Sequence, residues 1–117
     1  MPDISVPASL RNCCLTLGNF DGVHRGHQHI LQSTRRLADR LQVPAVAATF
    51  SPHPLELLRP GTAPAVITSL AERTRLLLAA GMDHVCVLPV TPQLLQMSAR
   101  DFFSAVLVGG FSARGIV

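Results

Sequence analysis

Short apolar runs alternate along the chain with longer segments of helical period. The runs cover residues 13–17, 43–50 and 84–88, and a fourth begins at 115–117. Near-continuous apolar runs of this length are typical of strands that are covered on both faces of a parallel sheet. We therefore expect four strands, with a helical segment between each strand and the next.

The segment after the first run has small or apolar residues at a spacing close to 3.6 residues. This spacing predicts an amphipathic helix whose stripe faces the sheet. His27 falls within the stripe, at the end nearest the preceding strand. The stripe consists of Val23, His27, Ile30, Leu31, Thr34, Leu37, Ala38 and Leu41.

Two further helices carry start and stop signals. Ser69 with Glu72 forms a capping box, and Gly81 is placed to end that helix. The run from Ser98 to Asp101 resembles a second cap, and glycines at 109–110 end the helix that follows. Residues 51–68 contain four prolines and a glycine, so we expect a long loop, which in a compact domain is usually functional.

This order of strands and helices predicts an α/β fold, a Rossmann-like doubly wound parallel sheet. With 117 residues the chain forms a single domain over 12–117, preceded by an irregular leader over 1–11. Ligands of such sheets bind beyond the carboxyl ends of the strands, at the switch point. The first strand ends at residue 17, so residues 18–28 are expected at that place.

Composition narrows the function classes. The net charge of +3 comes from ten scattered arginines without lysine, so we predict no nucleic-acid groove. Three cysteines lie in strands expected to be buried, which favours a reducing compartment over a disulfide framework. Neither a signal peptide nor an apolar run of about 18 residues is present, so a cytoplasmic protein without a membrane partner is expected.

The stretch 18–28, G-N-F-D-G-V-H-R-G-H-Q, carries the main chemical signal. A strand that breaks at glycine and leads into a helix N-terminus presents free N–H groups to a phosphate. His24 and His27, three residues apart, lie on one helix face and could both donate to that phosphate. The alternative is a turn in which Asp21 or Gly22 caps the helix without any ligand.

The H-x-G-H pattern resembles the nucleotidylyltransferase superfamily. The whole string resembles the N-terminal adenylyltransferase module of bacterial FAD synthetase, the bifunctional riboflavin kinase/FMN adenylyltransferase. The resemblance runs from about Asn12 to the last residue. It is supported downstream by T-F-S-P-H-P at 49–54, by residues 70–83 and by S-A-R-D-F-F at 98–103.

The resemblance implies transfer of AMP from ATP to FMN, which gives FAD and pyrophosphate. His24 and His27 would be the catalytic residues that stabilise charge on the ATP phosphates, and Mg²⁺ would be carried with ATP. Such a reaction depends on positioning and charge stabilisation. The residues expected to bind the nucleotide and flavin are Gly18, Asn19, Phe20, Asp21, Gly22, Gly26, Ser51, Pro52, His53 and Pro54.

Other interpretations of single residues stay open. His27 could be a core histidine, and His24, His27 and His53 could form a transition-metal site, although we expect no protein-bound metal. On the second helix, Arg73 and Arg75 are predicted to form a solvated face. Phe102 and Phe103 are predicted to belong to the core.

The resemblance also implies segments that the 117 residues do not contain. These are a G-x-D-F-x-F-G stretch, an I-S-S-T-x-I-R stretch and the kinase module. We therefore expect a sheet truncated at its fourth strand and little FAD synthesis by these residues alone. A non-catalytic nucleotide-binding remnant is one alternative. Another H-x-G-H enzyme, such as a cytidylyltransferase, is a second, and the G-N-F-D-G-V stretch argues against it.

Overall fold

The computed structural model describes residues 11–20, 23, 25–51 and 69–117. The predicted leader lies almost entirely outside these ranges. The elements, in chain order, are β1 (Cys14–Leu17), α1 (Arg25–Leu41), β2 (Ala45–Ser51), α3 (Leu70–Ala79), β3 (His84–Pro89), α4 (Pro92–Gln96), α5 (Ala99–Phe102), the π-helical segment η3 (Phe103–Gly110) and β4 (Gly115–Ile116). Among the described helices, none combines the length and apolar character needed to cross a membrane.

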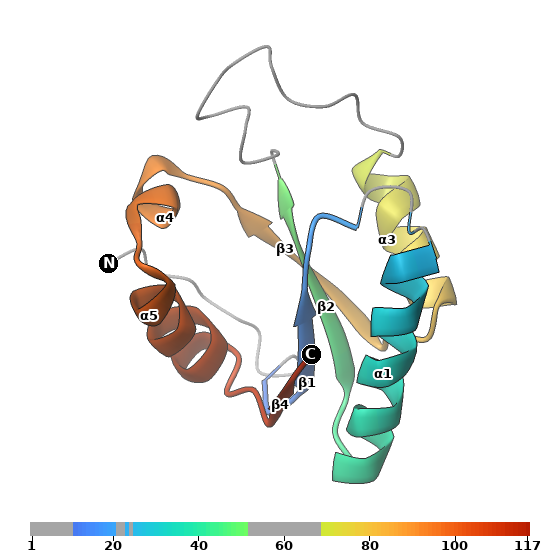
Figure 1. The fold of residues 1–117 in the computed structure, drawn as a ribbon. Helices are drawn as coiled ribbons and strands as arrows, with labels where there is room; N and C mark the ends of the chain where they lie inside the picture. The colour runs from blue at the N-terminus through green and yellow to red at the C-terminus, as the bar shows by residue number, and fades with distance from the viewer. Residues whose placement is uncertain (1–10, 21–22, 24, 52–68) are drawn as a thin grey trace.

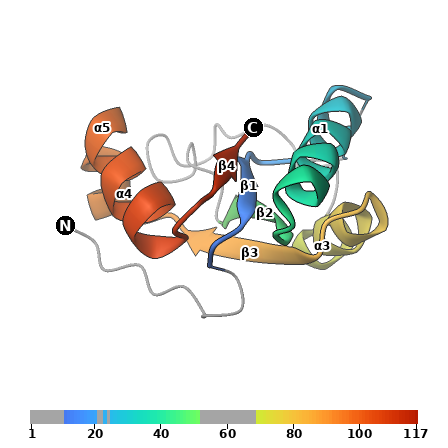
Figure 2. The same cartoon turned by 90° about the horizontal axis from the view of Figure 1, so that it is seen from below.

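The described strands form one parallel sheet in the order β3-β2-β1-β4. Helices α1 and α3 cover one face, and α4, α5 and η3 lie on the other (Figures 1 and 2). The predicted doubly wound α/β fold is confirmed. The short strand β4 pairs with β1 through Cys14 opposite Gly115 and Leu15 opposite Ile116, which places the switch in strand order between β1 and β4.

Alternating side chains of β1 and β2 supply two hydrophobic cores. Cys14 and Ala47 pack on the side of α1 and α3. Leu15 and Val46 pack on the opposite side, against η3 and the fully buried Phe111. Because both faces are covered, these central strands are mostly apolar, as the sequence predicted, and their threonines Thr16 and Thr49 are buried as well.

The stripe of α1 is only partly as predicted. Leu31, Thr34 and Ala38 are buried against the sheet. Ile30 and Leu41, in contrast, are 38% and 36% exposed. Val23 is buried but precedes the helix, because its φ of 44° is not helical. The buried stripe is therefore narrower and shorter than the apolar pattern predicted.

Helix ends follow the local signals closely. The Ser69 side chain accepts a hydrogen bond from the Glu72 N–H (3.1 Å), and the Ser98 hydroxyl caps α5 in the same way. Gly81, with φ of 105°, follows the end of α3, as predicted. Helix α4 was not predicted, although Thr91 is its N-cap and a proline begins its first turn.

Two expectations of burial were wrong. Cys86 is half-buried because β3 is an edge strand of the described sheet, and Val87 beside it is 37% exposed. Phe102 packs against the core, whereas Phe103 is 50% exposed. Adjacent helical positions differ by about 100° in direction, which here places Phe102 towards the core and Phe103 towards solvent.

Candidate functional site

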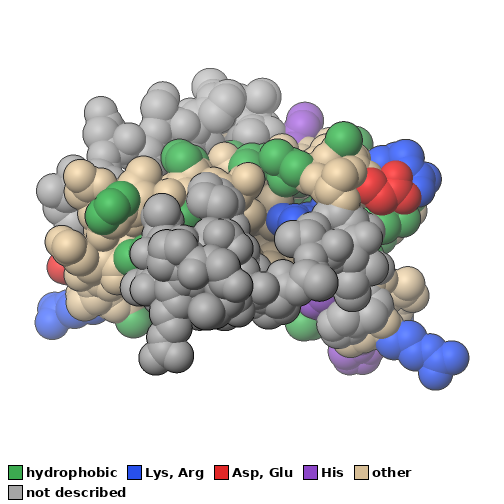
Figure 3. Space-filling view, turned by 90° about the horizontal axis from the view of Figure 1, so that it is seen from above, with side chains coloured by type: hydrophobic (Ala, Val, Ile, Leu, Met, Phe, Trp, Pro, Cys, Tyr) green, Lys and Arg blue, Asp and Glu red, His purple; other side chains and the backbone are tan. Residues whose placement is uncertain are grey.

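The carboxyl ends of β1, β2 and β3 meet at one edge of the sheet. These strands end at Leu17, Ser51 and Pro89, and the N-terminus of α1 lies at the same edge. Figure 3 views the molecule from this side, where the visible histidine side chains lie on the half formed by α1 and α3. The edge is where a doubly wound sheet binds its ligands.

The turn after β1 begins with Gly18, where the ring of Phe20 leaves little room for a side chain. The Gly18 N–H donates to the Ala48 carbonyl of β2 at 3.1 Å, which holds the turn against the sheet. A Cβ atom at position 18 would lie 3.2 Å from the ring of Phe20. A side chain at this position would therefore require the Phe20 ring to shift by a few tenths of an ångström.

Phe20 and Val23 both have backbone conformations that their side chains disfavour. Their φ angles are 52° and 44°, and a positive φ at a bulky or β-branched residue is strained. The Val23 N–H donates to the Phe20 carbonyl at 3.2 Å, and Gln28 Nε2 donates to the Val23 carbonyl at 3.3 Å. Both side chains are buried, so packing and hydrogen bonds hold the strained turn in place.

His27 lies in the first turn of α1 and is half-buried. Its ring meets that of Phe20 in an edge-to-face contact, with centroids 5.2 Å apart and planes at 72°. The helical pattern predicted a buried position for His27, and this prediction is therefore only partly met. The strained Phe20 backbone orients the aromatic ring against which His27 rests.

The N-terminus of α1 favours an anion. The helix has 17 residues, and its first turn holds Gly26 and His27 without an acidic side chain. The positive end of the helix dipole is thus not offset by a carboxylate of that turn. The N-terminus of a helix can attract a phosphate through its backbone N–H groups.

A buried arginine ties α3 to the same edge. Arg73 is 9% exposed, and its Nη1 donates to the Thr49 hydroxyl at 3.1 Å and to the Phe50 carbonyl at 3.4 Å. Thr49 Oγ1 in turn donates to the Asn19 carbonyl at 3.0 Å. The predicted solvated face is therefore wrong for Arg73. It is right for Arg75, which is exposed and pairs with Glu72.

The sequence contained a signal for the burial of Arg73. This residue lies four positions before Leu77, the fully buried leucine of α3, and residues at that spacing share a helix face. Its charge led to the opposite prediction because arginine is mostly exposed in proteins. The position of Arg73 on the same helix face as Leu77 indicates its burial better than its charge does.

The site residues fall into two groups. The structure brings together Gly18, Asn19, Phe20, Gly26 and His27 around the first turn, with Ser51 at the end of β2. The Ser51 carbonyl accepts from the Val90 N–H at 3.1 Å, which ties the last residue of β2 to the residue that follows β3. The remaining predicted residues lie outside the described ranges, so their roles stay predictions: Asp21, Gly22, His24, Pro52, His53 and Pro54.

The cysteine thiols lie away from this edge. Burial raises the pKa of Cys13 to about 11, and burial also raises the pKa of Cys14 and of Cys86. Thiols with raised pKa values are poor nucleophiles at neutral pH. Within the described ranges, no group of three or more His, Cys, Asp and Glu side chains is arranged to hold a metal ion.

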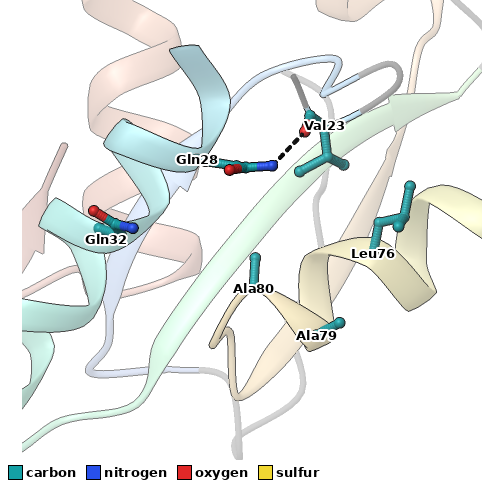
Figure 4. A pocket seen from close by; sticks show the side chains of 6 residues that line it. All are labelled: Val23, Gln28, Gln32, Leu76, Ala79 and Ala80. Atoms are coloured by element: carbon teal, nitrogen blue, oxygen red, sulfur yellow. Dashed lines mark hydrogen bonds between the residues drawn. The ribbon is translucent and has the colours of Figure 1, made fainter. Parts of the chain in front are cut away.

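A cavity of about 330 Å³ opens between α1 and α3. It begins beside Val23 and runs along both helices, between Gln28 and Gln32 on one side and Leu76, Ala79 and Ala80 on the other (Figure 4). Gln28 is turned towards the Val23 carbonyl. Because Val23 lines the cavity, the cavity adjoins the strained turn rather than the sheet edge itself.

These features define a class: a parallel α/β protein with a candidate anion site where β1 turns into α1. A family model described as FAD synthetase matches residues 6–117 of the chain. Since this match covers nearly the whole chain, the protein belongs to the FAD synthetase family.

Curated relatives agree with this assignment. The bifunctional riboflavin kinase/FMN adenylyltransferase of Escherichia coli K12 is 39% identical over 101 residues, which are 86% of this chain and 32% of that protein. The protein of the same name from Pseudomonas fluorescens is 41% identical over 104 residues, 89% of this chain and 33% of the relative. The chain therefore spans about a third of the length of the relatives it matches.

A solved structure shares the fold. A crystal structure described as a macrolide-efflux protein from Streptococcus pneumoniae superposes with a TM-score of 0.76 at 28% identity. The superposition covers 92% of this chain and 36% of that one. The likeness supports the α/β architecture over nearly the full length of the chain.

Proposed function

We propose that the chain is the nucleotide-binding part of an FMN adenylyltransferase, which transfers AMP from ATP to FMN and releases pyrophosphate. The observation that carries this proposal is the FAD synthetase match over residues 6–117. The relatives that are 39–41% identical are named for FMN adenylyltransferase activity. These matches do not favour the cytidylyltransferase or the non-catalytic remnant.

The described geometry suits this chemistry. In the reaction, a phosphate oxygen of FMN attacks the α-phosphorus of ATP, and the bond to the pyrophosphate oxygen breaks. No covalent nucleophile of the protein is needed, so the chain's task is to position phosphates and stabilise their charge. The N-terminus of α1 and His27 lie together at the sheet edge, where both can face the phosphates of one nucleotide.

Each remaining part of the site has a proposed role. His24 would be the second donor to the ATP phosphates, three residues before His27. Mg²⁺ would arrive with ATP, since this ion is usually bound through substrate phosphates and few protein ligands. The segment Ser51 to Pro54 would form part of the wall around the flavin and the nucleotide, and the kinase module would belong to the full-length protein.

Calorimetric titration of the 117-residue protein with Mg·ATP tests the proposal. We expect binding at one site, with CTP at least tenfold weaker. His27→Ala should weaken Mg·ATP binding about 10- to 100-fold, because a charge-assisted hydrogen bond contributes about 1.5–3 kcal/mol. His29→Ala is the matched control, since His29 is exposed on the same helix and should leave binding unchanged. Equal binding of ATP and CTP, or no binding of either, would contradict the proposal.

A further inference from the structure

Arg73 is a buried cation without an acidic partner in the described part of the chain. The ion pairs described there do not include it, and its Nε is buried without a hydrogen-bond partner among those residues. Burying a charge that lacks a counter-charge is unfavourable. Among the described residues, no ion pair therefore accounts for the burial of Arg73.

The contacts of Arg73 suggest another reason. A hydroxyl group has a single hydrogen, and it accepts through its lone pairs. Because the Arg73 guanidinium donates to Thr49 Oγ1, the hydroxyl hydrogen is left for the carbonyl of Asn19. The positive charge also polarises the hydroxyl and strengthens that second bond.

This chain of bonds joins three elements at the sheet edge. Arg73 belongs to α3, Thr49 to β2, and Asn19 to the turn between β1 and α1. Arg73 also donates to the carbonyl of Phe50, which is the last residue but one of β2. The turn after β1 and the end of β2 are thus held in a fixed relation by one side chain.

We propose that Arg73 is a positioning residue of the nucleotide site, acting through Thr49 on the Asn19 carbonyl. This inference rests on the proposed function. Asn19 lies between Gly18, which is bonded to β2, and Phe20, which orients His27. Releasing the Asn19 carbonyl therefore loosens the turn on which the proposed phosphate contacts depend.

The first test measures the turn without ligand. Amide hydrogen exchange at Gly18 should become at least tenfold faster in Arg73→Met and in Thr49→Val. The Asp83 N–H, bonded to the Ala45 carbonyl at the opposite end of the sheet, should exchange as in wild type. Arg75→Met is the matched control, because Arg75 is exposed two residues away and should change neither amide. Equal acceleration at Gly18 and Asp83 would show a merely structural role and overturn the inference.

The second test measures Mg·ATP binding in the same proteins. Arg73→Met should raise the Kd at least tenfold without lowering the Tm, since the substitution removes a buried charge that has no acidic partner among the described residues. Arg73→Lys should recover much of the affinity, because one nitrogen makes both hydrogen bonds and an ammonium group could replace it. If wild type binds Mg·ATP and Arg73→Met binds it equally, the inference alone fails. If wild type does not bind, the proposed function fails and the inference with it.

Discussion

Asp83 shows how one carboxylate can join three elements. It accepts hydrogen bonds from the Ala45 N–H of β2 and from Arg35 Nη1 of α1, at 2.8 and 2.9 Å, just before β3 begins. The hydrogen bond from Ala45, and then the guanidinium of Arg35, lower the pKa of Asp83 below its ordinary value of 3.8. The charged form is therefore favoured by the folded state.

This shift predicts a pH dependence of stability. A carboxyl group with a lowered folded pKa stabilises the protein above its unfolded pKa, and the effect is lost as the pH falls through the folded pKa. At pH 7, Asp83→Asn should have a free energy of unfolding about 1 kcal/mol lower than that of wild type. The value is modest because the carboxylate is 45% exposed. Urea unfolding should show this difference vanishing near pH 2, and a difference that does not change with pH would contradict it.

At the same scale, Arg73 and Arg75 show what the type of a residue does not reveal. They are two residues apart on α3, so they point about 200° apart around its axis. Nothing in the residue type distinguishes them, and only the phase of α3 against the sheet buries one and exposes the other. The glycine turn after β1 and the place of His27 in the first turn of α1, in contrast, were predictable because they depend on local spacing.

At the scale of elements, helix ends were predicted best. Ser69, Gly81 and Ser98 each act through residues within a turn of themselves, so tertiary packing does not change their signal. Predictions of burial along α1 and β3 were less accurate, because they depend on which strands lie at the sheet edge. That order is decided by contacts far apart in the chain.

The cap of α3 can be tested directly. Ser69 accepts from the Glu72 N–H at 3.1 Å, one turn before Arg73. Ser69→Ala should lower the free energy of unfolding by about 1 kcal/mol, the usual loss for an N-cap hydroxyl. Ser69→Asn, which keeps an acceptor, should be close to wild type. Denaturant unfolding measures both, and equal losses in the two variants would show that the hydroxyl does not act as a cap.

At the scale of the whole molecule, the alternation of apolar runs and helical segments was enough to predict the doubly wound sheet. The pairing of β4 with β1 is a finding of the structure that this alternation alone does not indicate. Topology is predictable in this way because right-handed crossovers allow few arrangements of parallel strands. The bonds of Arg73 join three elements, and neither the pattern nor the resemblance indicated them.

We propose that this chain serves as the nucleotide-binding part of an FMN adenylyltransferase. The most direct test replaces the matching 101 residues of the Escherichia coli relative with those of this chain and follows FAD formation from FMN and ATP by chromatography. We predict that this chimera synthesises FAD. His27→Ala in the chimera should lower kcat by about 10²–10³, the loss typical of one preorganised donor. A chimera that keeps riboflavin kinase activity but makes no FAD, or an unchanged kcat for His27→Ala, would contradict it.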